Sequence, residues 1–193
     1  LNRLDFGVQS FDDAMLARFG LFHGREEARR ASARARAAGF DNINLDLMYA
    51  LPGQDLDGAM ADLNAALALA PEHISHYHLT MEPNTVFAAT PPADLPDEDA
   101  ALDMQESCQS ALAEAGFQHY EVSAYARPGK RGEHNLNYWR FGDYLGIGAG
   151  AHATSCVWPS NVRLVSISMW CGSRNGFRSC ARWRMTNAAS NSC

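Results

Sequence analysis

The sequence predicts an α/β protein built on a parallel sheet or barrel. Segments rich in strand-forming residues alternate with helix-forming segments over residues 3–125. The joints between them are short, and two of them, "ARAAGFDNINLDL" and "LAEAGFQHYEVSA", repeat the order Ala-rich helix, Gly-Phe, strand. Alternating strands and helices with short joints form parallel sheets, and functional residues gather at the carboxyl ends of such strands.

Local composition predicts the individual elements. The expected strands are 3–11, 40–50, 73–82 and 117–125, and the expected helices are 12–19, 25–39, 55–71 and 97–116. The helix at 25–39 has acidic residues in its first turn and Gly39 as its stop, and Pro71 ends the helix at 55–71. Helical spacing gives the helix at 55–71 an apolar face of Leu56, Met60, Leu63 and Leu67. Residues 83–96 are expected to form a loop.

The strand expected at 40–50 has one apolar and one polar face. Its apolar set is Ile43, Leu45 and Leu47, and its polar set is Asn42, Asn44 and Asp46. Across the whole fold, the carboxyl ends of the strands carry Gln9 and Ser10, Asp46 and Tyr49, His78 and Glu82, and Ser123 and Tyr125. These positions are the ones that the fold class marks as functional.

Composition excludes some classes of protein. Hydrophobic residues make up 47% and charged residues 20% of the chain, which is typical of a globular domain with a real core. There is no apolar run long enough for a transmembrane helix, and the N-terminal residues do not resemble a secretory signal, so a cytoplasmic protein is expected. All 22 acidic residues lie in 1–155, which argues against a nucleic-acid surface. The chain begins without Met on a strand pattern, which suggests that it was cut from something longer.

Residues 156–193 follow a different pattern from the rest. They contain five Arg, no acidic residue and no Lys, and four of the five Cys in the chain. The spacing of these Cys fits neither a zinc nor an iron–sulfur pattern. The Arg residues either contact nucleic acid or, as we favour, belong to a positively charged unstructured end. We interpret this tail as a frame-shifted and disordered segment.

Asp46 and Gln9 are the first candidates for ligand binding. An ionised carboxylate only accepts hydrogen bonds, so Asp46 suits ribose hydroxyls or an amine. The alternative is an Asp inside a barrel that is paired with an Arg. Gln9 either binds a ligand through its amide or ties two loops together.

Two groups of histidines are candidate metal ligands. His76 and His78 share a strand face, but no acid or third His stands at a matching distance, which favours structural roles for them and for His73. His134 opens the stretch "HNLNYWRFGDYLGIGAGAH", where an imidazole and aromatic faces suit a porphyrin or a nucleobase. The alternative for this stretch is an ordinary loop whose aromatic residues fill the core. The Gly-rich end at 146–152 is only a weak signal for phosphate.

Five collinear blocks resemble one family. They are "RLDFGVQSFDDAMLARFG", "NINLDLMYALPGQ", "HISHYHLTMEPNT", "YEVSAYARPG" and "HNLNYWRFGDYLGIGAGAH". Over residues 1–153 they resemble the HemW heme chaperones, in the radical S-adenosylmethionine group of oxygen-independent coproporphyrinogen III oxidases. The resemblance implies that 1–126 are the C-terminal half of a partial (β/α)6, TIM-like barrel whose first three strands lie upstream of Leu1. It implies that 127–155 begin a HemN-type, heme-associated C-terminal region.

The resemblance also implies cofactors. The family holds a [4Fe-4S] cluster on a Cys-x3-Cys-x2-Cys loop, which this sequence lacks, so no residue of this chain is expected to ligate the cluster. Matching positions imply that Gln9, Asp46 and the backbone of Thr80 hold S-adenosylmethionine, and that His134 is the axial ligand of heme iron. Two positions depart from the family pattern: Leu21 stands where an Arg is usual, and Ala50 where a Gly is usual. Loss of that Arg removes a fixed donor for the carboxylate of the cofactor.

The implied function is binding of heme and its delivery to respiratory proteins in the cytoplasm. The alternative is oxidative decarboxylation of coproporphyrinogen III in porphyrin biosynthesis. Because the cluster motif is absent, the sequence leaves open whether this chain has enzymatic activity. The expected partners are heme and its recipients, with no nucleic acid and no membrane span.

Overall fold

The sheet has a parallel half and an antiparallel end. The computed structural model describes residues 3–18 and 24–144. Within them the strand order is β1-β2-β3-β5-β4. The strands β1 (Leu4–Gln9), β2 (Ile43–Tyr49) and β3 (His73–His78) run parallel to one another, as predicted. β5 (Ala124–Ala126) runs antiparallel to β3, and β4 (Gln118–His119) runs antiparallel to β5.

The prediction of one parallel strand over 117–125 was wrong. A tight turn divides this segment into the β4–β5 hairpin, because Tyr120 N donates to Ala124 O and Ala124 N donates to Glu121 O. The Glu121 carboxylate fixes the turn by accepting hydrogen bonds from the Ser123 amide and hydroxyl at 3.2 and 3.1 Å. Ser123 therefore lies in the turn and not at the carboxyl end of a parallel strand.

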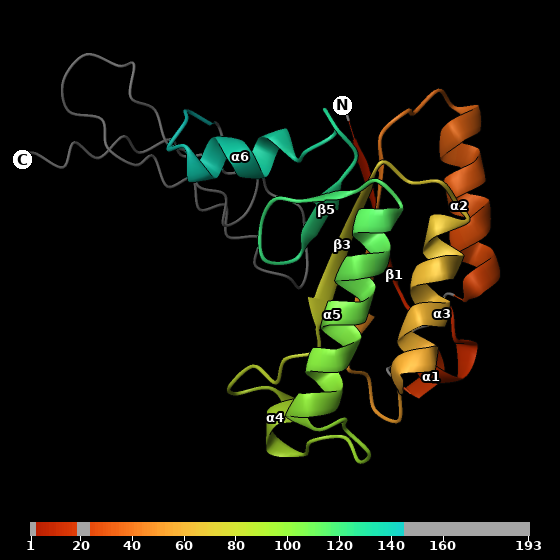
Figure 1. The fold of residues 1–193 in the computed structure, drawn as a ribbon, viewed down its shortest axis with the longest axis vertical. Coiled ribbons are helices and arrows are strands. Elements are labelled where there is room, and N and C mark those ends of the chain that lie inside the picture. The colour runs from red at the N-terminus through yellow and green to blue at the C-terminus, as the bar shows by residue number, and fades with distance from the viewer. Residues whose placement is uncertain (1–2, 19–23, 145–193) are drawn as a thin grey trace, which may run out of the picture. The chain divides into compact units, whose positions relative to one another are not determined.

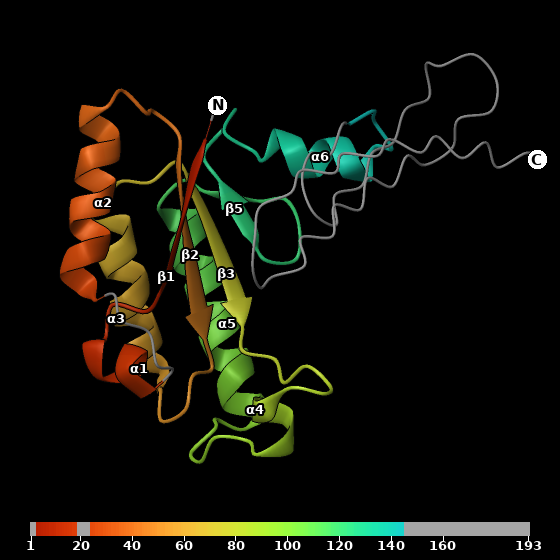
Figure 2. The ribbon, with the colours of Figure 1, turned by 180° about the vertical axis from the view of Figure 1, so that it is seen from behind.

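Helices cover one face of this sheet. They are α2 (Arg25–Ala37), α3 (Leu56–Leu67) and α5 (Glu98–Glu114), and Figure 1 shows them together on one side of the strands. In Figure 2, which is turned by 180°, the strands lie in front of α5, and α2 and α3 lie beside them. The short helices α1 (Asp13–Arg18) and α4 (Val86–Ala89) lie near the carboxyl ends of β2 and β3. α4 occupies part of the segment 83–96 that was expected to be a loop.

Side-chain caps define the helix starts. Asp55 accepts a hydrogen bond from Gly58 N, and Asp97 accepts one from Ala100 N, each at 2.8 Å. These bonds satisfy amides that have no partner inside the helix. Gly39, after α2, and Gly116, after α5, have φ of +90° and +85°, where a residue with a Cβ is strained. In both repeated joints, the helix therefore ends just before the glycine.

The core lies between the sheet and the helices. It contains Val8 of β1, Ile43, Leu45 and Leu47 of β2, Ile74 of β3, Leu63 of α3, and Met104, Cys108 and Leu112 of α5. The apolar face predicted for β2 is confirmed, since its three aliphatic side chains are fully buried. The predicted face of α3 was partly wrong. Leu56 is 40% exposed, and the buried face includes Asp62, which is 5% exposed.

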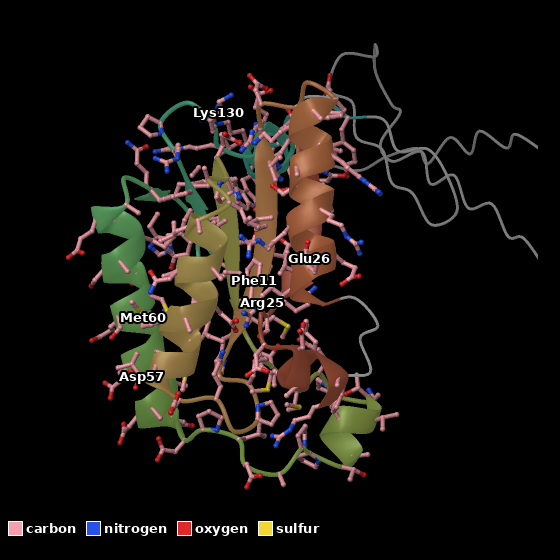
Figure 3. All side chains as sticks on the ribbon, turned by 90° about the vertical axis from the view of Figure 1, so that its right-hand side faces the viewer. Phe11, Arg25, Glu26, Asp57, Met60 and Lys130 are labelled. Atoms are coloured by element: carbon pink, nitrogen blue, oxygen red, sulfur yellow. The ribbon has the colours of Figure 1, made fainter. Side chains whose placement is uncertain are left out.

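Asp62 is buried because it organises the joint after β1. Its carboxylate accepts hydrogen bonds from Ser10 Oγ at 2.7 Å, Phe11 N at 2.6 Å and Gln54 Nε2 at 3.3 Å. Arg25, at the start of α2, donates from Nε to the carbonyl oxygen of Phe11 at 2.8 Å (Figure 3). The end of β1 is thus held to two helices by polar contacts.

The chain divides into two compact units. The first is Leu1–Arg131, and the second begins at Gly132, whereas the sequence-based boundary lies after residue 126. The described part of the second unit contains the helix α6 (Glu133–Trp139). No helix in the described residues is long and apolar enough to cross a membrane. Residues 145–193, with the Gly-rich segment at 146–152 and the proposed frame-shifted tail, lie outside the described residues, as does Leu21.

Candidate functional site

Asp46 and the end of β1 meet at neighbouring strands. Asp46 of β2 pairs in register with Gly7 of β1, and a β-bulge between Gly7 and Gln9 shifts the register so that Gln9 pairs with Leu47. Gln9 has a φ of +66°, in the left-handed region. Strained backbone of this kind concentrates at functional sites and is consistent with a binding role. The structure therefore brings together two of the residues that the sequence nominated.

The absence of a side chain at Gly7 matters for Gln9. A Cβ on Gly7 would lie 2.9 Å from Gln9 Nε2, closer than real Cβ atoms come to other heavy atoms. The Gln9 amide therefore lies over the Gly7 backbone, and Gly7 is the residue that pairs with Asp46. Between them, the amide and the carboxylate offer both a hydrogen-bond donor and acceptors.

Among the residues that the structure describes, Asp46 has a side-chain hydrogen bond with Asn44 and none with an Arg. Asn44 Nδ2 donates to Asp46 Oδ1 at 2.7 Å. His73 Nδ1 and Ser75 Oγ lie 2.7 and 3.1 Å from Asn44 Oδ1, and the Tyr120 hydroxyl lies 2.6 Å from His73 Nε2. The sequence placed Asn44 on the face of Asp46 but missed His73 and Tyr120. The strand register could have found His73, because it pairs with Asn44 across β2 and β3.

Burial keeps two of the strand histidines neutral. It lowers the pKa of His73 to about 4, with a further decrease from the positive charge of Arg3 and an increase from Asp5. Burial alone lowers the pKa of His76 to about 4. His76 lies on the helix side of β3, with its ring 4.7 Å from the Tyr49 ring. In the part of the chain that the structure describes, no three His, Cys, Asp or Glu residues are arranged to hold a metal ion.

Thr80 follows β3 in an exposed loop. The preceding amide, Leu79 N, donates to Tyr49 O at 3.1 Å. This bond holds the backbone next to Thr80 against the carboxyl end of β2, the strand that carries Asp46.

His134 belongs to the second unit and is exposed on α6. Its ring meets the ring of Tyr138 edge to face, with 4.7 Å between the centroids, and the Tyr138 and Tyr144 rings are 4.1 Å apart. Trp139 is 48% exposed. Residues 134–139 of this stretch are thus helical, and the side chains of His134, Tyr138 and Trp139 are exposed.

Curated relatives match most of this chain. It is 53% identical to the heme chaperone HemW of Escherichia coli K12 over 152 residues, which are 79% of this chain and 40% of that protein. It is 53% identical to HemW of Haemophilus influenzae over 150 residues and 42% identical to HemW of Bacillus subtilis over 155 residues. The chain belongs to the HemW family. No protein-family model matches the chain.

A solved structure supports the same placement. The HemW-family chain is similar to the coproporphyrinogen III oxidase HemN from Escherichia coli, a radical SAM enzyme, with a TM-score of 0.67 and 27% identity. The match covers 79% of this chain and 38% of HemN. The expected fold, part of a radical SAM barrel, is therefore confirmed. The chain spans about 40% of the length of the HemW proteins that it matches.

Proposed function

We propose that this chain is part of a HemW-type heme chaperone and carries both a heme ligand and part of an S-adenosylmethionine site. The whole protein would bind heme and deliver it to respiratory proteins in the cytoplasm. The observation that carries the proposal is the 53% identity to heme chaperones over a segment that includes α6. His134 would be the axial ligand of the heme iron, because its imidazole is exposed and lies beside aromatic rings.

The residues of the first unit fit the proposed S-adenosylmethionine site. Asp46 would accept hydrogen bonds from ribose hydroxyls or the amine, Gln9 would contribute its amide, and Thr80 its backbone. When bound on a cluster, this cofactor supplies radical chemistry. The described residues do not fit the [4Fe-4S] cluster, because Cys108 is fully buried and burial raises the pKa of its thiol to about 11. Cluster ligands must be thiolates.

A hemin titration of the full chain, followed by the Soret band, tests the heme proposal. Wild type is expected to shift the band, and His134→Ala is expected to abolish the shift or weaken binding by about tenfold or more. His119→Gln is the matched control, because it removes an exposed imidazole of the first unit that stacks on Tyr125. Equal affinity for wild type and His134→Ala would refute the role of His134. Weaker hemin binding by His119→Gln alone would indicate that the heme site lies in the first unit.

A second candidate function is oxidation of coproporphyrinogen III, and the similarity to HemN favours it. Its test is decarboxylation of coproporphyrinogen III by the whole protein with a reconstituted cluster and S-adenosylmethionine. Formation of protoporphyrinogen IX, with no hemin binding, would favour this activity over heme transport.

A further inference from the structure

The face of β2 and β3 opposite the helices carries polar side chains that are buried. Asn44 is 1% exposed, His73 is 2% exposed and Ser75 is 6% exposed. A buried polar group without a partner costs about 1–3 kcal/mol, so the partners of these side chains determine what the face can do. The register explains why the side chains meet: Asn44 pairs with His73, and Asp46 pairs with Ser75.

Three side chains of this face and one from the β4–β5 turn form a continuous row of contacts. The Tyr120 hydroxyl, in the β4–β5 turn, is 2.6 Å from His73 Nε2, and His73 Nδ1 is 2.7 Å from Asn44 Oδ1. Asn44 Nδ2 is 2.7 Å from Asp46 Oδ1. Each of these distances is at the short end of the range for a hydrogen bond. The row links the hairpin to the carboxylate through two strands.

Chemistry fixes the direction of every bond in this row. An ionised carboxylate only accepts, so the amide nitrogen of Asn44 must face Asp46 and its oxygen must face His73. That oxygen only accepts, so His73 must carry its proton on Nδ1. Because burial lowers the pKa of His73 to about 4, the ring is neutral at neutral pH and its Nε2 is an acceptor. Tyr120 must then donate its hydroxyl proton to Nε2.

We propose that Tyr120, His73 and Asn44 are positioning residues, which form a one-way hydrogen-bond chain that orients the Asp46 carboxylate for its ligand. The inference rests on the proposed binding of S-adenosylmethionine at Asp46. This row of hydrogen bonds reaches the Asp46 carboxylate through one bond to Oδ1. Because a carboxylate has about four lone-pair sites, Asp46 keeps acceptor capacity for the hydroxyl or amine of a ligand. Hydrogen bonds aligned in one direction polarise one another, so the first link at Tyr120 affects the last link at Asp46.

The test compares four forms of the full chain: wild type, Tyr120→Phe, Asp46→Asn and the double variant. Tyr120→Phe removes one hydroxyl and keeps the ring that meets the His73 ring edge to face. Tyr125→Phe is the matched control, because it removes a buried hydroxyl from the same hairpin. Thermal unfolding and far-UV circular dichroism of each variant show whether the fold is retained.

The first readout uses no ligand. Long-range ¹H–¹⁵N spectra at neutral pH are expected to show His73 as the Nδ1-protonated tautomer, with its Nε2 signal shifted in Tyr120→Phe and unchanged in Tyr125→Phe. An Nε2-protonated His73 in wild type would overturn the chain of bonds, whether or not S-adenosylmethionine binds.

The second readout is the affinity for S-adenosylmethionine, measured by equilibrium dialysis. Tyr120→Phe is expected to weaken binding by about threefold or more when Asp46 is present and to have no effect in the Asp46→Asn background, which is the signature of coupled residues. Equal losses in both backgrounds would overturn the positioning role. If wild type does not bind S-adenosylmethionine, the proposed cofactor site fails, and the tautomer of His73 alone decides whether the bond chain stands.

Discussion

Replacement of Asp62 by Ala is expected to lower the free energy of unfolding of the first unit by about 2–4 kcal/mol. The carboxylate accepts two short hydrogen bonds, from Ser10 Oγ at 2.7 Å and Phe11 N at 2.6 Å, and a longer one from Gln54 at 3.3 Å. Each buried donor that loses its acceptor costs about 1–3 kcal/mol, and relief of the buried charge offsets part of that sum. The two short bonds therefore set the estimate.

Urea unfolding followed by far-UV circular dichroism measures this loss. For a chain of this size, about 1 kcal/mol corresponds to a change of roughly 2–4 °C in Tm, so Asp62→Ala is expected to melt roughly 5–15 °C below wild type. Asp103→Ala is the control, because Asp103 is exposed in the middle of α5 and its loss should leave the midpoint unchanged. A decrease below about 1 kcal/mol for Asp62→Ala would refute the reasoning, because it would mean that the joint after β1 relaxes and finds other acceptors.

The dependence of stability on pH gives the same site a second test. Burial raises the pKa of Asp62 above its ordinary value, although the hydrogen bonds from Ser10 and Phe11 oppose this shift. The folded state thus binds the proton more tightly than the unfolded state does. This tighter binding of the proton by Asp62 stabilises the folded state. The stabilisation is fully present below the ordinary aspartate pKa, about 3.9, and is lost as pH rises through the raised pKa of Asp62. Asp62→Asn should remove this slope, and an unchanged slope in that variant would contradict the assignment.

Three further changes have defined outcomes. Ala50 has a φ of +58°, which costs a non-glycine residue about 1–2 kcal/mol, so Ala50→Gly should raise the stability measured in urea by about 0.5–1 kcal/mol after the added flexibility of Gly. Gly7→Ala places a Cβ 2.9 Å from Gln9 Nε2 and should weaken S-adenosylmethionine binding, measured by equilibrium dialysis, with little change in Tm. An unchanged affinity would exclude Gln9 from the site. Cys108, fully buried with a pKa raised to about 11, should resist iodoacetamide at neutral pH until urea unfolds the chain, as read by peptide mass mapping.

Periodicity in the sequence predicted the parallel half of the fold because burial dominates there. In β2, Leu45 and Leu47 lie on the face that packs against the helices, and Asn44 and Asp46 alternate with them on the face that carries polar partners. The caps at Asp55 and Asp97 and the stop at Gly116 act within a few residues, so local composition was sufficient to place the helices.

What the sequence did not predict depends on contacts between distant residues. The hairpin turn is fixed by the Glu121 side chain and lacks the Gly or Asn that usually signals a turn. Asp62 lies on the buried side of α3 because Ser10 and Phe11, about fifty residues earlier, supply its donors. For the same reason, the sequence did not predict that His73 is a partner of Asn44 or that Tyr120 is a partner of His73. Polar groups become partners only when the strand register is known.

The buried polar row of β2 and β3 also bears on how the strands find their alignment. Side chains alternate between the two faces of a strand, so a slip of one residue would turn Asn44 and Asp46 toward the helices and into contact with aliphatic side chains. Such a slip would take the Asn44 side chain away from His73 Nδ1, and a buried donor without an acceptor costs about 1–3 kcal/mol. An all-aliphatic pair of strands would lack this penalty. The contact between Asn44 and His73 therefore favours the observed register of β2 and β3 over a register shifted by one residue.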